Sequence, residues 1–302
     1  MVFHFISMLD IKEDIESVLQ FASEIKAHPE KYWTVLANRS LGMVFEKPST
    51  RTRISFETGM TQLGGHALYL SPKDLQIGRG ETIADTARVI SRYVDIIMYR
   101  AFSHSMMKEL ARHATVPVIN ALDDLEHPCQ IMADLLTIKE KKGGFDLNLV
   151  YLGDGNNVCN SLLLGSAVVG MNMTVSTPLG KEPNAHIFKK ALEIAEETAA
   201  EIKIVHEPEK AVREADVLYT DVWVSMGEKE KDKSIYIPYQ LNMNLVKKAK
   251  KDVIVMHCLP AHRGEEITDE VMESGHSVVF DQAENRLHVQ KAIMLWLLGL
   301  MP

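Results

Sequence analysis

The sequence predicts an α/β protein with two doubly wound domains, each a parallel sheet flanked by helices. Three observations support this prediction. Short β-branched or apolar runs alternate with helical stretches along the chain, which is typical of parallel sheets covered by helices. The length of 302 residues, with 46% hydrophobic residues, suits two ordinary cores. A charged helix end closed by two glycines, at residues 139–144, places the division near Gly143.

The first domain is expected to span residues 1–143. Asp10 and Glu13 have the spacing of a capping box, which predicts a helix over residues 11–25. A further helix is expected from Gln130 to about Lys141. Apolar side chains recur on one face of another predicted helix at Ile83, Ala87, Ile90 and Val94. The strands expected in this domain are Leu41–Glu46, Ala67–Leu70, Asp95–Tyr99 and Val116–Asn120.

The second domain is expected to span residues 144–285. A last helix, from about Glu284 to Leu298, is almost continuously apolar at its end and must be buried. We expect its residues 286–302 to pack back on the first domain. The strands expected in the second domain are Leu149–Leu152, Met173–Ser176, Ile202–Val205, Val217–Thr220, Val253–His257 and Val278–Asp281.

The composition limits the classes of function. The formal net charge is −8, from 41 acidic and 33 basic residues. An acidic chain without a long Lys/Arg run is a poor candidate for sequence-independent nucleic-acid or membrane-surface binding, which needs a basic face. The longest apolar stretch, Ala292–Leu298, is far shorter than the ~18–20 residues of a membrane span. Three cysteines without a C-x-x-C pair suggest neither a disulfide framework nor a cysteine-rich zinc site. We therefore expect a cytoplasmic protein without nucleic-acid or membrane partners.

The segment Phe45–Arg53 has the pattern of an anion site. It follows a predicted strand that Pro48 ends, and it precedes a helix that begins near Thr52. A helix N-terminus offers unpaired N–H groups and the positive end of its dipole. Three hydroxyl and two guanidinium groups lie within five residues, which suits a dianionic phosphate. Without further motifs, a capped helix with solvated arginines would explain the same residues.

Further motifs accompany this segment. Ser49-Thr50-Arg51-Thr52-Arg53 resembles the carbamoyl-phosphate motif of aspartate and ornithine carbamoyltransferases. His127-Pro128-Cys129-Gln130 resembles their His-Pro-x-Gln motif, in the form typical of the ornithine enzymes. The resemblance implies that His127 donates to the carbamoyl oxygen, that Arg100 shares this oxygen, and that Gln130 accepts from the carbamoyl NH₂. Judged alone, Arg100 would be a solvated residue at a strand end and His127 a turn residue.

The segment Asp154-Gly155-Asn156-Asn157 follows the first predicted strand of the second domain. Gly153 and Gly155 fit the first two positions of the dinucleotide fingerprint G-x-G-x-x-G, but Val158 stands at the third, which argues against a dinucleotide site. The segment resembles instead the Asp-Gly-Asn-Asn motif of ornithine carbamoyltransferases. The resemblance implies that Asn157 contacts the carboxylate of the amino-acid substrate.

The segment Asp221–Gly227 contains a Ser-Met-Gly loop that resembles the ornithine enzymes and that aspartate carbamoyltransferases lack. By this resemblance, Asp221 and Ser225 bind the α-ammonium group and the Met226 backbone N–H binds the α-carboxylate. A carboxylate is needed beside a cationic substrate because a buried ammonium group is costly unless it is paired. Judged alone, the segment would be a loop with an exposed acid and a buried tryptophan.

His257-Cys258-Leu259-Pro260 resembles the most specific motif of the ornithine enzymes, whose Cys and Leu carbonyl lie beside the reacting δ-amine. No further Cys or His at a suitable spacing supports zinc binding by His257 and Cys258. A nucleophilic Cys258 assisted by His257 would need a low thiol pKa, which the sequence does not establish.

Two more matches complete the implied site. Glu284-Asn285-Arg286 resembles the family's Glu-Asn-Arg, whose Arg helps to bind carbamoyl phosphate, and Gln76 matches the residue that enters the site of a neighbouring subunit. The implied catalytic residues are Arg51, Arg100, His127 and Cys258. The implied ornithine ligands are Asn157, Asp221, Ser225 and Met226. The implied carbamoyl-phosphate ligands are Ser49, Thr50, Arg51, Thr52, Gln76, Arg100, His127, Gln130, Cys258, Leu259 and Arg286.

The resemblance implies transfer of the carbamoyl group from carbamoyl phosphate to the δ-amine of L-ornithine, which gives L-citrulline and phosphate in arginine biosynthesis. The oxyanion of the tetrahedral intermediate would be stabilised by Thr52, Arg100 and His127. No metal or organic cofactor is expected, because carbamoyl phosphate is already activated. A homotrimer is implied as the assembly. Two alternatives remain: a carbamoyltransferase for another amine, such as putrescine or N-acetylornithine, and a non-catalytic anion-binding homologue.

Overall fold

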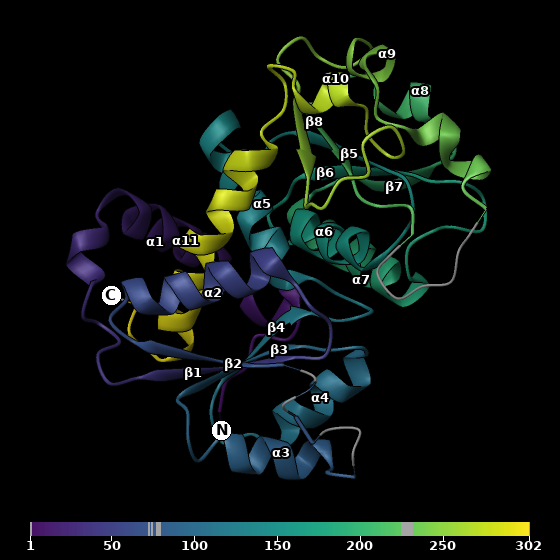
Figure 1. The fold of residues 1–302 in the computed structure, drawn as a ribbon. Coiled ribbons are helices and arrows are strands. Elements are labelled where there is room, and N and C mark those ends of the chain that lie inside the picture. Colours follow the sequence, from purple (N-terminus) through teal and green to yellow (C-terminus); the bar gives the residue numbers. More distant parts are fainter. Residues whose placement is uncertain (1, 72, 74, 77–79, 225–231, 302) are drawn as a thin grey trace. The chain divides into compact units, whose positions relative to one another are not determined.

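The computed structural model describes residues 2–71, 73, 75–76, 80–224 and 232–301. The chain forms two compact units (Figure 1), of which unit 1 contains Met1–Leu136 and Asn285–Pro302 and unit 2 contains Thr137–Glu284. Each unit has a parallel sheet flanked by helices, so the predicted α/β class with two doubly wound domains is confirmed. The division between the units falls inside helix α5 (Pro128–Lys142), and Gly143 follows the end of that helix.

Unit 1 is built on a four-stranded sheet in the order β2-β1-β3-β4, with all neighbours parallel. Each strand lies where the sequence predicts one, with small shifts at its ends. The strand order reverses between β1 and β3, and ligands of doubly wound sheets bind at the carboxyl ends of strands at such a point. The strands are β1 (Ser40–Phe45), β2 (His66–Leu70), β3 (Ile96–Arg100) and β4 (Val118–Leu122).

Helices cover both faces of this sheet. Residues of α3 and α4 pack on one face, against Val44, Ile97, Tyr99 and Val118. Figure 1 shows α1, α2 and part of α11 (Val279–Leu297) on the other face. Of the predicted helical face, Ala87 and Ile90 are buried in this core. The helices of unit 1, besides parts of α5 and α11, are α1 (Ile15–Ala27), α2 (Thr50–Gln62), α3 (Ile83–Ile90) and α4 (His104–His113).

The structure corrects the first predicted helix. The capping box is formed by Ser7 and Asp10, not by Asp10 and Glu13, and it opens a short 3₁₀ helix, Met8–Ile11. The Asp10 carboxylate accepts from the Ser7 N–H at 2.9 Å and from the Ile6 N–H at 2.7 Å. Because Asp10 already faces these preceding N–H groups, it does not cap the following turn, and α1 begins only at Ile15.

Unit 2 is built on a five-stranded parallel sheet in the order β7-β6-β5-β8-β9. Five of the six predicted strands are present in it. The strands are β5 (Asn148–Leu152), β6 (Asn172–Ser176), β7 (Ile202–Val205), β8 (Val217–Thr220) and β9 (Ile254–His257). The helices are α6 (Asn157–Val168), α7 (Ala185–Thr198), α8 (Pro208–Ala211), α9 (Met243–Val246) and α10 (Asp269–Met272), with a 3₁₀ helix at Ser234–Tyr239. Residues of α8, α9 and α10 share one core with β5, β8 and β9.

The sixth predicted strand, Val278–Asp281, is wrong. An isolated parallel bridge pairs Val255 with Ser277, in which the Val255 N–H donates to His276 O at 2.8 Å and the Val278 N–H donates to Val255 O at 3.0 Å. The Gln282 N–H then donates to Val278 O, and helix α11 (Val279–Leu297) begins. A short apolar run is compatible with either a buried strand or a buried helix. Here the helical pattern that follows the run begins at Val279, so most of the predicted strand belongs to α11.

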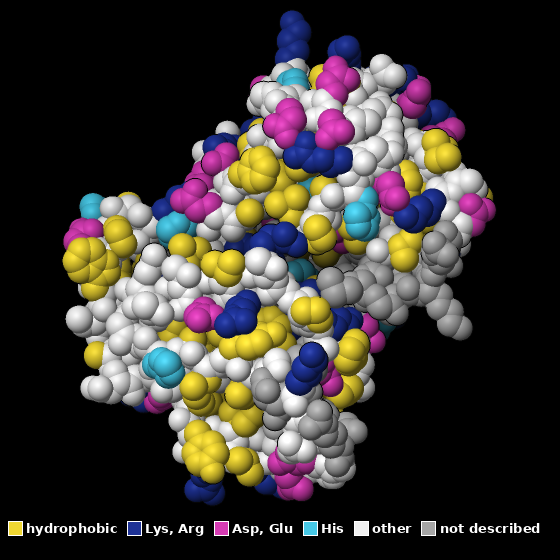
Figure 2. Space-filling model, in the orientation of Figure 1, with side chains coloured by type: hydrophobic (Ala, Val, Ile, Leu, Met, Phe, Trp, Pro, Cys, Tyr) yellow, Lys and Arg dark blue, Asp and Glu magenta, His cyan; other side chains and the backbone are white. Residues whose placement is uncertain are grey.

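Most of the apolar end of the last helix is buried, as predicted, with Trp296 half-buried, and its residues from Asn285 onward belong to unit 1. Trp296 anchors this end, since its Nε1–H donates to Asp14 at 3.1 Å and its ring meets Phe3 and Phe5 edge-on. Among the described residues, no helix is long and apolar enough to cross a membrane. Figure 2 shows Lys and Arg side chains interspersed with Asp and Glu on the face drawn, in keeping with the acidic composition.

Candidate functional site

The predicted phosphate segment lies at the carboxyl edge of the first sheet. Phe45, the last residue of β1, is in register with Arg100, the last residue of β3, so the loop after β1 starts beside Arg100. Ser49 is extended (φ −158°) and its hydroxyl accepts from the Thr52 N–H at 3.3 Å. Ser49 is therefore the N-cap of α2, which begins at Thr50 rather than near Thr52. The first turn of the helix presents its N–H groups at this edge.

Arg286 of α11 joins three of the predicted ligands. Its Nη1 donates to Gln130 Oε1 at 2.8 Å, and its Nη2 donates to Thr52 Oγ1 at 3.0 Å. Nη1 also lies 3.4 Å from His127 Nε2. All four residues are buried. Because they come from α11, α2 and the start of α5, the fold gathers predicted ligands that are far apart in the sequence.

His127 is held as a neutral imidazole. Burial, together with the positive charges of Arg286, Arg100 and Arg51, holds the pKa of His127 well below its ordinary value. A guanidinium group can only donate, so the contact with Arg286 makes Nε2 the acceptor and leaves the ring proton on Nδ1. The imidazole can thus serve as a neutral hydrogen-bond donor, which is the role that the sequence resemblance implies for it.

Positive charge is concentrated at this edge of unit 1. Arg286 and Arg100 are buried and Arg51 is half-buried, and the charges of all three act on His127. Gathering like charges away from water is costly, and a dianionic ligand would offset this cost through charge-assisted hydrogen bonds. The three guanidinium groups are therefore the main physical indication of an anion site in unit 1.

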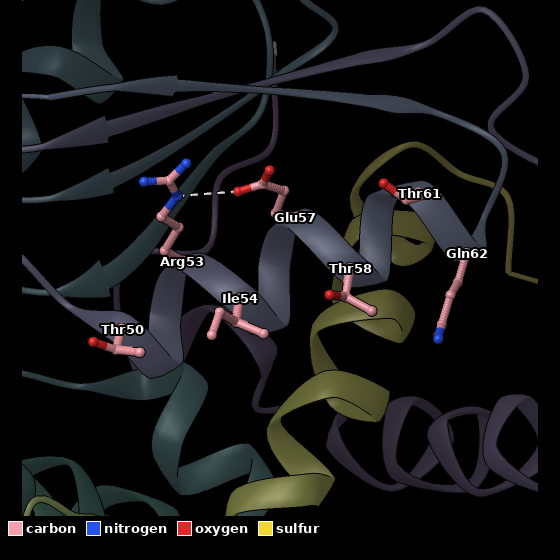
Figure 3. Close-up of a pocket in the computed structure, with 7 residues that line it drawn as sticks. All are labelled: Thr50, Arg53, Ile54, Glu57, Thr58, Thr61 and Gln62. Carbon is pink, nitrogen blue, oxygen red and sulfur yellow. Dashed lines mark hydrogen bonds and ion pairs between the residues drawn. The ribbon is translucent and has the colours of Figure 1, made fainter.

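The two arginines of the Ser-Thr-Arg-Thr-Arg segment have different surroundings. The Nε of Arg53 donates to Glu57 at 3.1 Å, and its guanidinium group lies 4.0 Å from the centre of the Tyr69 ring. Arg53 lines an open hollow of about 650 Å³ along α2 (Figure 3). The hollow is lined by Thr50, Arg53, Ile54, Glu57, Thr58, Thr61 and Gln62. Because the hollow shares only Thr50 with the predicted ligands, the cluster around Arg286, without Arg53, is the better candidate for an anion site.

The other half of the predicted site is centred on Asp221 in unit 2. Asp221 follows β8 and is 5% exposed. Asn156 Nδ2 donates to its Oδ2 at 2.7 Å, and Cys258 Sγ donates to its Oδ1 at 3.0 Å. Both donors are neutral, and no lysine or arginine of the described residues forms an ion pair with this carboxylate. A buried carboxylate in such surroundings is suited to bind a cation from a ligand.

Residues that follow three neighbouring strands meet here. In the order β5-β8-β9, Leu152 is in register with Thr220, and Thr220 with His257. The chain beyond these positions leads to Asn156, Asp221 and Cys258. Parallel strands place their carboxyl ends at one edge of the sheet, which explains why the three side chains converge.

His257 has both ring nitrogens occupied. Nδ1 accepts from the Leu259 N–H at 2.8 Å, so the ring proton is on Nε2, which lies 3.1 Å from the buried carboxylate of Glu266. Ligand atoms of Asp221, His257 and Cys258 lie within 4.8 Å of one another. A metal ion bound there would have to break one of the hydrogen bonds of His257, so the geometry does not favour a metal site.

The three cysteines are buried thiols. Burial raises the pKa of Cys129 to about 12 and raises the pKa of Cys159 well above its ordinary value. Cys258 donates to Asp221, and a thiol that donates a hydrogen bond to a carboxylate is protonated. The geometry therefore favours Cys258 as a hydrogen-bond donor over the nucleophile that the sequence leaves open.

Five further predicted ligands remain, of which three lie in the part of the chain that the structure describes. Gln76 is exposed, and Leu259 and Asn157 are half-buried, with Asn157 the first residue of α6. Ser225 and Met226 lie outside the described residues.

The sequence interpretation missed Asn156. Its side chain caps α6 and also holds Asp221, whereas the motif resemblance assigns a ligand role only to Asn157. An Asn directly before a helix that follows a strand suggests a cap, but nothing in the sequence shows that its amide reaches the loop after another strand.

In a comparison with known proteins, two family models match consecutive parts of the chain. The family model described as aspartate/ornithine carbamoyltransferase, carbamoyl-P binding domain, matches residues 4–140. The model described as aspartate/ornithine carbamoyltransferase, Asp/Orn binding domain, matches residues 145–297.

Relatives named ornithine carbamoyltransferase are similar over nearly their whole length. The protein of Archaeoglobus fulgidus is 58% identical, over 98% of this chain and 97% of its own. That of Methanothermobacter thermautotrophicus is 56% identical, over 98% and 99%. Among solved structures, the ornithine carbamoyltransferase from Pyrococcus furiosus is 50% identical, with a TM-score of 0.94 and coverage of 98% and 97%.

Proposed function

The chain belongs to the aspartate/ornithine carbamoyltransferase family, and from that premise we propose how it acts as an ornithine carbamoyltransferase. It transfers the carbamoyl group of carbamoyl phosphate to the δ-amine of L-ornithine, giving L-citrulline and phosphate. The observation that carries this assignment is the contrast between the two half-sites. One gathers three guanidinium groups around a neutral imidazole, and the other holds a buried carboxylate between two neutral donors.

We propose that each domain binds mainly one substrate. We assign residues 1–143 and 286–302 to carbamoyl phosphate and residues 144–285 to ornithine. The α2 N-terminus with Ser49, Thr50, Arg51 and Thr52 binds the phosphate, whose charge Arg286 also balances. Asp221 binds the α-ammonium group of ornithine. We further assign Ser225 to the same ammonium group, and Asn157 and the Met226 N–H to the α-carboxylate.

The chemistry needs positioning and charge stabilisation rather than a cofactor. The neutral δ-amine attacks the carbamoyl carbon, a C–N bond forms, and negative charge develops on the carbamoyl oxygen. Arg100, His127 and Thr52 donate to that oxygen. The C–O bond to phosphate then breaks, and we assign the proton that the attacking nitrogen loses to an oxygen of the departing phosphate. Gln130 accepts from the carbamoyl NH₂, and Cys258 and the Leu259 carbonyl lie beside the reacting amine.

Three finer assignments belong to the same proposal. We place the protein in the cytoplasm and in arginine biosynthesis. One relative is named as catabolic and one solved relative as anabolic. Because the family contains both, measurement of the direction of flux in the source cell tests the placement in biosynthesis. We also propose a homotrimer, in which exposed Gln76 enters the site of a neighbouring subunit.

The direct test is citrulline formation from carbamoyl phosphate and L-ornithine, with L-aspartate, putrescine and N-acetyl-L-ornithine assayed in parallel. We expect turnover with L-ornithine alone, because Asp221 offers its charge to a free α-ammonium group. Preference for putrescine or N-acetylornithine would contradict the assignment of Asp221 and the Ser-Met-Gly loop while leaving the carbamoyl-phosphate half intact. Absence of turnover with every amine would support the non-catalytic alternative.

A further inference from the structure

We infer that Asn156 is a positioning residue for the substrate ammonium group, because its amide fixes the Asp221 carboxylate that binds this group. The inference rests on the proposed function, in which Asp221 binds the α-ammonium group of ornithine. Asn156 itself need not touch the substrate. It acts through Asp221, to which it donates its shortest side-chain hydrogen bond, 2.7 Å from Nδ2 to Oδ2.

The orientation of the Asn156 amide follows from its contacts. Its Oδ1 accepts from the backbone N–H groups of Val158 and Cys159, at 3.0 and 3.1 Å, which makes Asn156 the N-cap of α6. The Tyr151 hydroxyl lies 3.3 Å from the same oxygen. A flipped amide would set its NH₂ against two N–H donors and its oxygen against a carboxylate. The cap therefore fixes Nδ2 toward Asp221.

The cap also fixes Asp221 in space. The side chain of Asn156 is tied to the first turn of α6, a helix whose residues are mostly buried. The opposite oxygen of Asp221 is held by Cys258, which follows β9. With one donor on each oxygen, the carboxylate has a set rotation and keeps its remaining lone pairs for a ligand.

The neutrality of both donors matters as much as their positions. A lysine or arginine at either position would neutralise Asp221 and compete with the substrate ammonium group. An amide and a thiol hold the carboxylate without cancelling its charge. Asn156 therefore fixes the orientation of the carboxylate without placing a positive charge beside it.

Two substitutions separate the cap from the donor. Asn156→Ser keeps an N-cap oxygen but removes the amide donor. Asn156→Asp also keeps the cap, and its second oxygen meets Asp221 Oδ2 as a like charge. We expect KM for L-ornithine to rise by about 10-fold in Asn156→Ser and by about 100-fold in Asn156→Asp, in line with loss of a hydrogen bond to a charged group. KM for carbamoyl phosphate should stay within about twofold of the wild-type value.

Asn242→Ser is the matched control, because Asn242 caps α9 through the same pair of backbone N–H bonds. It should leave both KM values unchanged. The ligand also provides a control: inhibition by L-norvaline, which keeps the α-ammonium group, should weaken as much as ornithine binding, whereas inhibition by pentanoate, which lacks it, should not change.

The outcomes are distinguishable. Wild-type protein without ornithine turnover would overturn the proposed function itself. With an active wild type, an unchanged KM for ornithine in Asn156→Ser would overturn the inference alone. A parallel loss for ornithine, carbamoyl phosphate and pentanoate, with a lowered Tm, would show a merely structural role and overturn it as well.

Discussion

At the scale of single residues, the site depends on groups whose protonation state is set by their neighbours. His127 is neutral because it is buried among three arginines, and Cys258 is a thiol because it donates to Asp221. Asp221 is held by the Asn156 amide and the Cys258 thiol. These states follow from contacts between segments that are far apart in the sequence, and each has a measurable consequence.

The depressed pKa of His127 makes stability depend on pH. As the pH falls below about 6.5, the ordinary pKa of histidine, the unfolded chain binds a proton at this residue that the folded protein does not. Stability must therefore fall with falling pH, by at most about 1.4 kcal/mol per pH unit from this one group. We expect the drop in Tm between pH 7.5 and pH 5.5 to be smaller in His127→Gln than in the wild type. Equal drops would contradict a neutral, buried His127.

The Cys258 thiol provides a second test. If it acts as a donor to Asp221, Cys258→Ala should raise KM for ornithine by about 10-fold, and Cys258→Ser, which retains a donor, should recover much of this loss. Steady-state kinetics of the two variants measure KM for ornithine and the turnover rate. If both variants instead lost turnover by about four orders of magnitude or more, Cys258 would be a nucleophile rather than a donor.

At the scale of elements, both half-sites lie where a loop leaves the carboxyl end of a parallel strand and enters a helix. Ser49 caps α2 after β1, and Asn156 caps α6 after β5. The polypeptide between β5 and α6 is closely packed. A Cβ on Gly155 would lie 2.3 Å from the backbone nitrogen of Pro183, and the Gly155 N–H donates to Lys181 O at 2.9 Å.

Gly155→Ala should therefore displace the start of α6 together with Asn156. We expect a lower Tm, from a loss of about 1–3 kcal/mol typical of an overpacked position, and a raised KM for ornithine. Gly144→Ala is the control, since no neighbouring atom lies within 4 Å of its added Cβ. A Gly155→Ala protein with wild-type Tm and KM would show that this turn is more tolerant than its packing indicates.

The elements also show which parts of the fold and of the candidate site could be predicted from the sequence. Nine strands of the described chain lie close to their predicted places, because β-branched runs between helical patterns are a local signal. The Val278–Asp281 strand and the Asp10–Glu13 box were mispredicted where two local patterns compete for the same residues. The motifs supplied the candidate site residues, but the separate surroundings of Arg53 and the double role of Asn156 depend on tertiary contacts.

At the scale of the whole molecule, the chain divides the two binding tasks between two units of the same architecture. Unit 1 concentrates buried positive charge although the chain carries a net charge of −8. The proposed anion site is thus a local feature of one sheet edge, which is compatible with the acidic composition of the whole chain.

The mass of the assembly in solution tests the proposed homotrimer. The chain has a mass of 34.0 kDa, so light scattering coupled to size exclusion should give about three times this value. Gln76→Ala should lower turnover without changing that mass, because the residue is exposed in the isolated chain and is proposed to act in a neighbouring site. A fully active monomer would contradict both the assembly and the role of Gln76.

The assignment of the phosphate site is tested most directly by comparing the two arginines of the Ser-Thr-Arg-Thr-Arg segment in one assay. The assay measures citrulline formation as a function of carbamoyl-phosphate concentration. Arg51 belongs to the cationic cluster around His127, whereas Arg53 pairs with Glu57 and lies over Tyr69. We expect Arg51→Ala to lower kcat/KM for carbamoyl phosphate by about 10²–10³-fold or more, and Arg53→Ala to change it by less than about threefold. Substantial turnover by a folded Arg51→Ala protein, or an equal loss in both variants, would contradict the assignment of the phosphate site.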